Sequence, residues 1–347
     1  MAKNKWLNWL LPLLLLLVII TATAIGAVSI SLEDMYNALL HKFQGQKAAS
    51  VYEGVFLYLR TPRVLLCVIT GAALAVSGVL MQGLFRNPIV EPGMVGTSAG
   101  AAFGASVVFV LAASWEASAK IYASLTIVPL FAFAGAILST LLVYRLAGNT
   151  KSVSLVHLLL IGISVNAVAL SGTGFMSYTA RDPQARSITF WNLGTFTGAS
   201  WTQVAITGSI VGLSLIFCRR YAAPLNLLLL GESEAAYLGV SVSKLKRQLL
   251  IVNTLLVAIT TAFVGVISFV GLIVPHILRS LIGSDHRRLI PYSAMAGAIV
   301  VVLADLLARM LLAPAEIPIG IITSLVGAPL FIVLLKRSSF LLKNNQS

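Results

Sequence analysis

Long apolar segments separated by short polar breaks repeat along the whole chain. The first covers about residues 6–30, and nine more follow at about 61–85, 93–113, 121–146, 153–176, 201–219, 247–264, 266–283, 291–311 and 317–336. Most are close to the roughly 20 apolar residues that a helix needs to cross a bilayer. The pattern predicts an all-α integral membrane protein with about ten transmembrane helices, forming one polytopic domain over residues 1–347.

Two of these segments allow more than one interpretation. The first could be a signal peptide, because Ala22-Thr23-Ala24 resembles a cleavage site, but its apolar run is too long for that and predicts an uncleaved helix. The seventh and eighth segments are not separated by a charged residue. Gly265, Gly271 and Pro275 suggest a short or broken helix there, which a membrane tolerates only where the freed backbone is buried in protein or lines a cavity.

The charges of the loops predict the orientation. With the N-terminus inside, the inner loops and ends carry 16 Lys and Arg residues and the outer ones carry 8. This bias predicts that both termini are cytoplasmic. Helices two to five and seven to ten then form two four-helix blocks of opposite orientation, the arrangement of an inverted repeat.

Composition excludes a soluble protein. The chain is 58% apolar and only 10% charged, and its mean hydropathy is +0.95. The net charge of +13 comes from clusters between apolar runs, which favours contact with anionic lipid over nucleic acid. Cys67 and Cys218 lie inside apolar segments, so we expect packing residues and no disulfide.

The longest polar break covers residues 219–247. Its basic residues stand on both sides of a short amphipathic segment. This pattern predicts a cytoplasmic surface helix or helix pair that contacts another protein. The charged residues of the break are Arg219, Arg220, Glu232, Glu234, Lys244, Lys246 and Arg247. The third apolar segment opens differently. Gly96, Gly100 and Gly104 form one helical stripe, which favours close packing against a neighbouring helix, with lining of a transport path as the alternative.

The sequence carries little catalytic chemistry. It has no G-x-x-x-x-G-K-[ST] motif, so the chain itself is not expected to hydrolyse nucleotide. Ser98 stands in Gly-Thr-Ser-Ala-Gly, which superficially resembles the site of a nucleophilic serine. Such a serine needs a positioned general base, and His157 and His276 are only loose candidates for that role. No cluster with metal-ligand spacing is present, and we expect no catalytic residue, resident metal or bound cofactor.

Ionisable residues inside the predicted helices are few. Asp305 is the one expected deep in a helix, and Arg309 one turn later predicts a structural ion pair. A secondary transporter or channel that works alone remains an alternative, but it would be expected to place more charge in the membrane. At the outer ends, Arg60, Arg63 and Arg309 either snorkel to the interface or receive carboxylates of a docking partner.

Several motifs in a fixed order resemble one family. They are Arg60-Thr-Pro-Arg63, the segments 71–83, 87–96 and 230–239, Phe269-Val-Gly-Leu-Ile-Val-Pro-His276 and Ala315-Glu-Ile-Pro-Ile-Gly320. With these residues the chain resembles the permease subunits of type II ABC importers for ferric siderophores, haem and cobalamin. The resemblance covers the second to the tenth predicted helix.

The resemblance implies an assembly. A second permease subunit, two cytoplasmic ATP-binding subunits and an extracytoplasmic binding protein would surround this chain in a bacterial inner membrane. The cargo would be an iron(III)–siderophore complex, with cobalamin or haem as alternatives. Nucleic acid is not an expected partner.

The resemblance also assigns residues. It implies that Arg60, Arg63 and Arg309 receive glutamates of the binding protein, and that Asn87, Ile89, Lys151 and Ser152 form an inner gate. Residues 228–241 would be coupling helices seated on the ATPase, resembling the EAA loop of importers although the spacing to the glycine is one residue shorter; the assigned residues are Leu230, Gly231, Glu232, Glu234, Ala235, Ala236 and Gly239.

Overall fold

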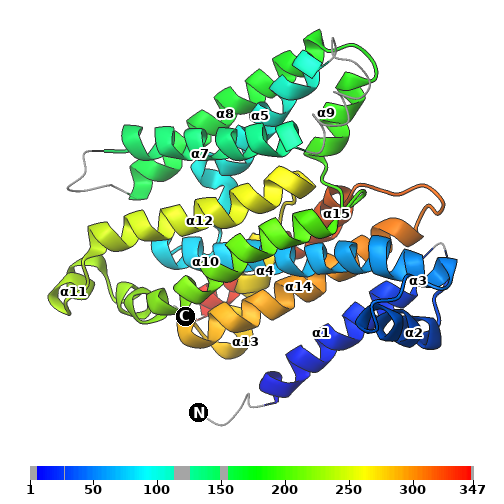
Figure 1. The fold of residues 1–347 in the computed structure, drawn as a ribbon. Coiled ribbons are helices and arrows are strands. Elements are labelled where there is room, and N and C mark those ends of the chain that lie inside the picture. Colours follow the sequence, from blue (N-terminus) through cyan, green and yellow to red (C-terminus); the bar gives the residue numbers. More distant parts are fainter. Residues whose placement is uncertain (1–5, 27, 113–125, 149–154, 345–347) are drawn as a thin grey trace.

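Helices make up every regular element of the part of the chain that the computed structural model describes, residues 6–26, 28–112, 126–148 and 155–344 (Figure 1). Seven of the helices are long and apolar enough to span a membrane, and three shorter apolar helices stand at the third, eighth and tenth predicted positions. The all-α architecture and the ten predicted spans therefore agree with the described residues.

The ten helices at the predicted spans are α1 (Leu7–Ala24), α4 (Thr61–Phe85), α5 (Thr97–Leu111), α7 (Val128–Leu146), α8 (Leu155–Thr179), α10 (Trp201–Leu228), α12 (Val242–Val264), α13 (Val270–Ile282), α14 (His286–Met310) and α15 (Ile319–Asn344). Between them the described residues form six short helices, α2 (Leu32–Phe43), α3 (Val51–Val55), η1 (Phe56–Arg60), η2 (Pro92–Val95), α9 (Gln184–Asn192) and α11 (Glu232–Tyr237).

Two predicted boundaries differ from the structure by nine residues or more. The second helix begins at Val51 instead of residue 61, because α3, η1 and α4 form one continuous helix through Pro62. The π-helical turn η1 precedes this proline and relieves the clash that its ring would make with the preceding turn. The sixth helix runs to Leu228, nine residues beyond the predicted end, since Arg219 and Arg220 remain helical.

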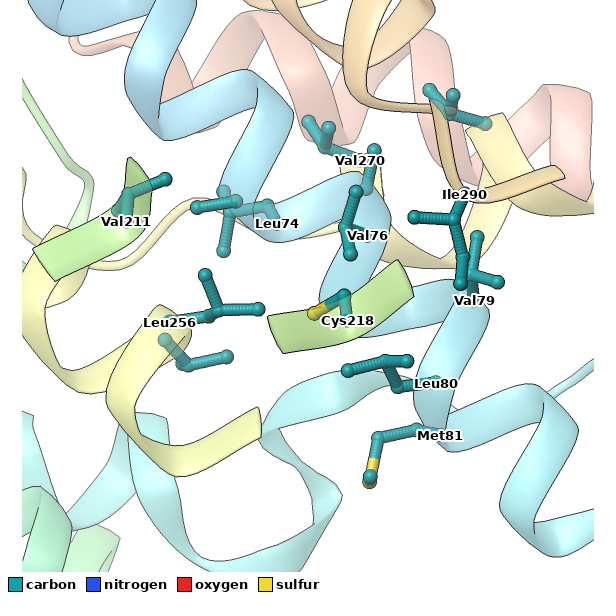
Figure 2. Packing of buried hydrophobic residues seen from close by; sticks show 14 of the residues in the cluster. Leu74, Val76, Val79, Leu80, Met81, Val211, Cys218, Leu256, Val270 and Ile290 are labelled. Atoms are coloured by element: carbon teal, nitrogen blue, oxygen red, sulfur yellow. The ribbon is translucent and has the colours of Figure 1, made fainter. Parts of the chain in front are cut away.

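Helix α4 is the centre of the core. Its buried side chains meet α10, α12, α13 and α14, which surround it (Figure 2). Glycines allow two of these helices to approach closely: a Cβ atom on Gly71 would lie 2.2 Å from the carbonyl oxygen of Gly297, and one on Gly78 would lie 1.8 Å from that of Gly271. Backbone therefore meets backbone at both crossings, which fixes how α13 and α14 lie on α4.

The two predicted four-helix blocks correspond to α4, α5, α7, α8 and α12, α13, α14, α15. In both, the second helix is short and follows a broken segment, residues 86–96 in the first block and 265–269 in the second. Helix α4 packs on α13 and α14, and α12 packs on the equivalent α5 and α7. This repeated pairing is that of an inverted repeat whose halves cross at α4 and α12.

The broken segment predicted between the seventh and eighth helices is present. Gly265 ends α12 with φ +75°, and its Cα faces the carbonyl of Trp191, where a Cβ would lie 2.1 Å away. The freed backbone groups find partners in the protein: Thr195 N donates to Val264 O at 2.8 Å, and Phe269 N donates to the Glu91 carboxylate at 3.1 Å. The predicted condition, burial of the freed backbone in protein, is met.

The ends of the bundle differ. The start of α1, α11 and the end of α15 lie toward one end, and α2, α3 and α9 lie toward the other (Figure 1). We call these the α11 end and the α2 end. Cys67 and Cys218 are fully buried free thiols, as predicted, within the core around α4.

Candidate functional site

Helix α11 is a single short helix at the α11 end. It is formed by Glu232–Tyr237 and not by a helix pair, because α10 continues through the first part of the predicted polar break. Gly231 precedes it at φ +136°, and the Glu234 side chain folds over this glycine so that a Cβ would lie 1.8 Å from Glu234 Oε2. Gly239 ends the segment at φ +88°, a left-handed conformation that favours glycine.

One face of α11 is attached to the bundle. Ala235 is fully buried, and Glu232 Oε2 accepts a hydrogen bond from Lys246 Nζ of α12 at 2.7 Å. The Lys246 side chain is only 8% exposed, so this ion pair is largely removed from water on the lysine side. Helix α11 is therefore connected directly to α12, so a movement of α11 is transmitted to α12.

The other face of α11 is free in this chain. Tyr237 is 91% exposed and Leu230 64% exposed, and Leu238 beside them is also exposed. Of the residues assigned to coupling, Ala236 lies on the same exposed helix, and Glu234 covers Gly231 instead of extending away from it. An exposed apolar surface beside a carboxylate is typical of a protein-binding site.

A second connection leaves the last turn of α10. Asn226 Nδ2 donates to Asp285 Oδ1 at 2.6 Å, and Asn226 Oδ1 accepts from His286 N at 2.9 Å. Burial raises the pKa of Asp285, but the hydrogen bonds from Asn226 and Arg287 outweigh it and hold the pKa below its usual value. His286 is fully buried and lies against Gly83 of α4, where a Cβ would be 2.6 Å from its Nε2.

Both connections lead to the broken segment 86–96. Asn253, in the middle of α12, accepts from Ser77 Oγ of α4 and donates to Pro92 O at 3.3 Å. Gly83 stands only three residues before the segment. Glu91, within it, accepts from Phe269 N at the start of α13, so the broken segments of the two blocks are joined to each other.

The predicted gate residues lie partly in this segment. Asn87 and Ile89 are exposed, and Asn87 Oδ1 accepts from Ile89 N at 3.0 Å in a tight turn. Lys151 and Ser152 lie outside the described residues. Two of the four predicted gate residues therefore lie on the segment that the contacts from α11 and α10 reach, and their gating role stays a prediction.

An open groove of about 430 Å³ lies beside segment 86–96. Its lining includes more polar groups than the other large grooves described, and these are Glu91, Ser98, Asn166, Asn192 and Ser268. The stripe glycines lie on the opposite side of α5: Cβ atoms on Gly100 and Gly104 would lie 2.4 Å and 2.2 Å from carbonyl oxygens of α7, and one on Gly96 would lie 2.7 Å from Ser139 Oγ. The three glycines therefore take part in helix packing, whereas Ser98 lines the groove.

Near the α2 end, buried ions connect α4 and α14. Arg63 donates to Asp305 through Nε and Nη2, at 3.1 and 2.9 Å to Oδ1, and to Glu316 Oε1 through Nη1 at 2.8 Å. Arg309 Nε lies 3.1 Å from Asp305 Oδ2, so the predicted Asp305–Arg309 pair is present. Burial raises the pKa of Glu316, but hydrogen bonds from Arg63 and Thr197 outweigh this and lower it overall.

Arg60 and Arg309 hold the end of α1. Arg60 donates to the carbonyls of Thr23 and Ala24 at 2.8 and 2.7 Å, and Arg309 donates to Ala22 O at 2.9 Å. Carbonyls in the last turn of a helix have no partner within that helix, so the guanidinium groups cap α1. None of the three arginines presents a free guanidinium here, and a docking role, which stays a prediction, requires them to exchange partners.

Some residues of this arrangement were not assigned from the sequence. Asn253 is a polar residue in the middle of an apolar helix, a signal that was present. Glu316 lies within the 315–320 motif, but nothing local indicates its contact with Arg63, 253 residues away. Among the described residues no three His, Cys, Asp or Glu side chains gather as a metal site would.

Comparisons with known proteins extend over nearly the whole chain. The model of the FecCD transport family matches residues 13–337. The hemin transport system permease protein HmuU of Yersinia pestis is 38% identical, with 95% of each chain covered. The vitamin B12 import system permease protein BtuC of Citrobacter koseri is 36% identical, covering 96% of this chain and 94% of the relative.

A solved structure is also similar. It shows an inward-facing conformation of a metal-chelate type ABC transporter, with 32% sequence identity and a TM-score of 0.80. The likeness covers 96% of this chain and 100% of that one. Sequence and structure comparisons therefore point to the same group of proteins.

Proposed function

Because this chain belongs to the FecCD transport family and is an ABC importer permease, we propose that it carries an iron(III)–siderophore complex into the cytoplasm, driven by ATP hydrolysis on separate subunits. Helix α11 is the observation that supports the coupling. It exposes Tyr237 and Leu230 to a partner on one side and is joined to spanning helix α12 by the Glu232–Lys246 pair on the other. The chain is a transport component, and the ATPase is the partner.

The assembly follows from this proposal. Two ATP-binding subunits contact the α11 end, which is the cytoplasmic one, so both termini are cytoplasmic. A second permease subunit, as a second copy or a relative, completes the path, and an extracytoplasmic binding protein docks at the α2 end. The membrane is the inner membrane of a bacterium.

The contacts suggest how ATP hydrolysis reaches the path. Closure of the ATPase pair displaces α11 as a rigid body, and the Glu232–Lys246 pair passes this displacement to α12. Asn253 then displaces Pro92. Asn226 and His286 transmit the displacement of the end of α10 to Gly83. Both routes act on segment 86–96, which carries Glu91 beside the groove and would open and close the path.

The coupling role has a direct test. We expect the double substitution Glu234→Arg and Gly239→Trp to abolish substrate-stimulated ATPase in the reconstituted complex, because it reverses charge and adds bulk on the surface facing the partner. The measurement is ATP hydrolysis in proteoliposomes with and without substrate-loaded binding protein.

The control uses matched positions at the α2 end. Gly198 has φ +79° and, like Gly239, open space around it, and Glu33 is an exposed carboxylate. Because the binding protein docks at this end, the double variant Glu33→Arg and Gly198→Trp is judged by its basal ATPase and by its copurification with the ATP-binding subunits, and it should keep both. Undiminished stimulation in the α11 variant, with normal amounts in the membrane, would disprove the coupling role.

The substrate is tested separately. The relatives at 38% and 36% identity are named for haem and vitamin B12, so both compounds are the alternatives to a ferric siderophore. A strain without this permease is expected to lose uptake of labelled ferric siderophore and to regain it when the gene is restored. Loss of haem or cobalamin uptake alone would replace the siderophore by that compound and leave the coupling intact.

A further inference from the structure

Helix α2 (Leu32–Phe43) has three sides of different character around its axis. One side carries large apolar residues that all point away from the protein, and we call them the apolar stripe: Leu32, Tyr36, Leu39, Leu40 and Phe43. Their spacing of four, seven, eight and eleven residues from the first places them on one face at 3.6 residues per turn. Phe43 is 90% and Leu32 68% exposed, so the described residues leave most of the stripe uncovered.

A second side of α2 is held by the protein. Ala38 is fully buried in a small apolar cluster with Ile30, Phe56 and Leu57, and α2 packs on α3 and η1. His41 Nδ1 lies 3.1 Å from Glu53 Oε2 of α3. These contacts fix the rotation of α2 and therefore the direction in which the stripe points.

The third side is polar. Glu33 and Asn37 occupy it, and Asp34 forms a capping box with Ser31 at the start of the helix. Apolar, protein-facing and polar sides thus follow one another around one short helix. A helix placed where protein, lipid and water meet has these three sides. In a helix surrounded by water and protein alone, the apolar side would be exposed to water, which is unfavourable.

The depth of α2 relative to the spanning helices can be read from its contacts. Lys42 Nζ lies 4.7 Å from the ring centre of Trp201, the first residue of α10, and Trp201 Nε1 donates to Leu57 O of η1 at 3.0 Å. Tryptophan is enriched where a spanning helix leaves the hydrocarbon core. The last turn of α2 therefore lies at the level where α10 enters the membrane.

The start of α2 lies at a similar level. It follows α1 after a short connection, and Arg60 binds the carbonyls of Thr23 and Ala24 at the end of α1. Exposed apolar residues continue on the neighbouring elements of this end, among them Ile25, Val28, Tyr58 and Leu59. Figure 1 shows α2 beside the end of α1. The apolar stripe is thus an extension of the lipid-facing sides of the spanning helices.

We propose that α2 is an interfacial helix whose apolar stripe binds the phospholipids of the leaflet at the α2 end. Its tyrosine and phenylalanine suit the boundary between acyl chains and head groups. A protein partner is less well matched, because protein interfaces combine apolar residues with about one hydrogen bond per 100–200 Å² and the Tyr36 hydroxyl is the one polar group on the stripe. By holding α3 and η1, α2 sets the depth at which the long α4 helix begins.

Spin labels can test the position of the stripe. Single cysteines replace Leu39 and Phe43 on the stripe and Glu33 and Asn37 on the polar side, in the assembled transporter in nanodiscs of phosphatidylethanolamine and phosphatidylglycerol. We expect labels at 39 and 43 to collide with dissolved oxygen and to collide severalfold less with a water-soluble nickel chelate than labels at 33 and 37. Equal collision with the chelate, or shielding of 39 and 43 from both reagents by protein, would overturn the proposal.

A measurement on the unaltered chain complements the labels. A phosphatidylcholine carrying a photoactivatable carbene precursor at mid-chain, mixed into the same nanodiscs, is expected to modify the peptide of residues 32–43. The buried peptide of residues 72–81 in α4 is the control and should remain unmodified, since its side chains are enclosed by protein. Absence of lipid adducts from 32–43, with adducts present on α1, would contradict the proposal.

Discussion

Replacement of Gly78 by valine is expected to remove folded permease from the membrane. A Cβ atom at this position would lie 1.8 Å from the carbonyl oxygen of Gly271 and 2.6 Å from its carbon. Both are backbone atoms, so no rotamer change relieves the overlap, and α4 and α13 would have to separate. The cost should exceed the roughly 1–3 kcal/mol of an overpacked side chain in a core.

The measurement is the amount of monodisperse permease after extraction, together with its thermal midpoint. Gly212→Val is the matched control, because Gly212 is also in a spanning helix but has no atom within 4 Å of the added Cβ. It should give a wild-type amount of protein. A Gly78→Val variant with an unchanged midpoint would show that α4 and α13 do not meet at these glycines.

Replacement of Asp305 by leucine is expected to destabilise the fold by about 3–5 kcal/mol, the cost of removing one partner of a buried ion pair. Asp305 is 2% exposed and takes contacts from both Arg63 and Arg309. Without it, Arg309 loses the one carboxylate that it contacts among the described residues, and Arg63 keeps only Glu316. Two cations would then remain buried close together.

Thermal unfolding in detergent measures this effect. Glu316→Gln is the control, since Glu316 is 37% exposed and an exposed ion pair contributes only about 0–1 kcal/mol. The double variant Asp305→Leu with Arg309→Leu should recover part of the loss, because it removes one of the stranded charges. Equal effects of Asp305→Leu and Glu316→Gln would contradict the buried position of Asp305.

The number and order of the spanning helices could be predicted from the sequence because each apolar run has a physical length that a bilayer requires. The boundaries were less accurate where a local signal had two meanings. Arg60-Thr-Pro-Arg63 resembles a helix start, but a π-helical turn carries the helix through Pro62. Arg219 and Arg220 resemble a helix end, but their side chains can reach water from inside a helix.

The 31–60 segment shows a similar ambiguity. Its charged residues are typical of a polar loop, yet Ser31 and Asp34 form a capping box and the apolar residues after them follow a helical period. At the α11 end, the position of the polar break was predictable, but its attachment to α12 depends on Glu232 meeting Lys246 fourteen residues later. Such pairings depend on tertiary packing, which no local pattern encodes.

Arg60, Arg63 and Arg309 show most clearly which contacts cannot be predicted from the sequence. Their position near helix ends was predictable, and so was the pairing of Asp305 with Arg309 one turn away. The partners of Arg63 come from residues 242 and 253 positions away, and those of Arg60 are backbone carbonyls of α1. A side chain can be assigned a docking role from its place in a motif, while the fold decides whether it is free.

The burial of Cys67 and Cys218 has a practical consequence. Both thiols are enclosed by the core around α4, so a maleimide reagent added to the native protein should find neither of them. The wild-type chain can then serve as its own unreactive background, without substitution of either residue. A single cysteine in place of Tyr237 would then be the one residue labelled with a fluorophore. The emission of this fluorophore could report the approach of a subunit to α11 in real time.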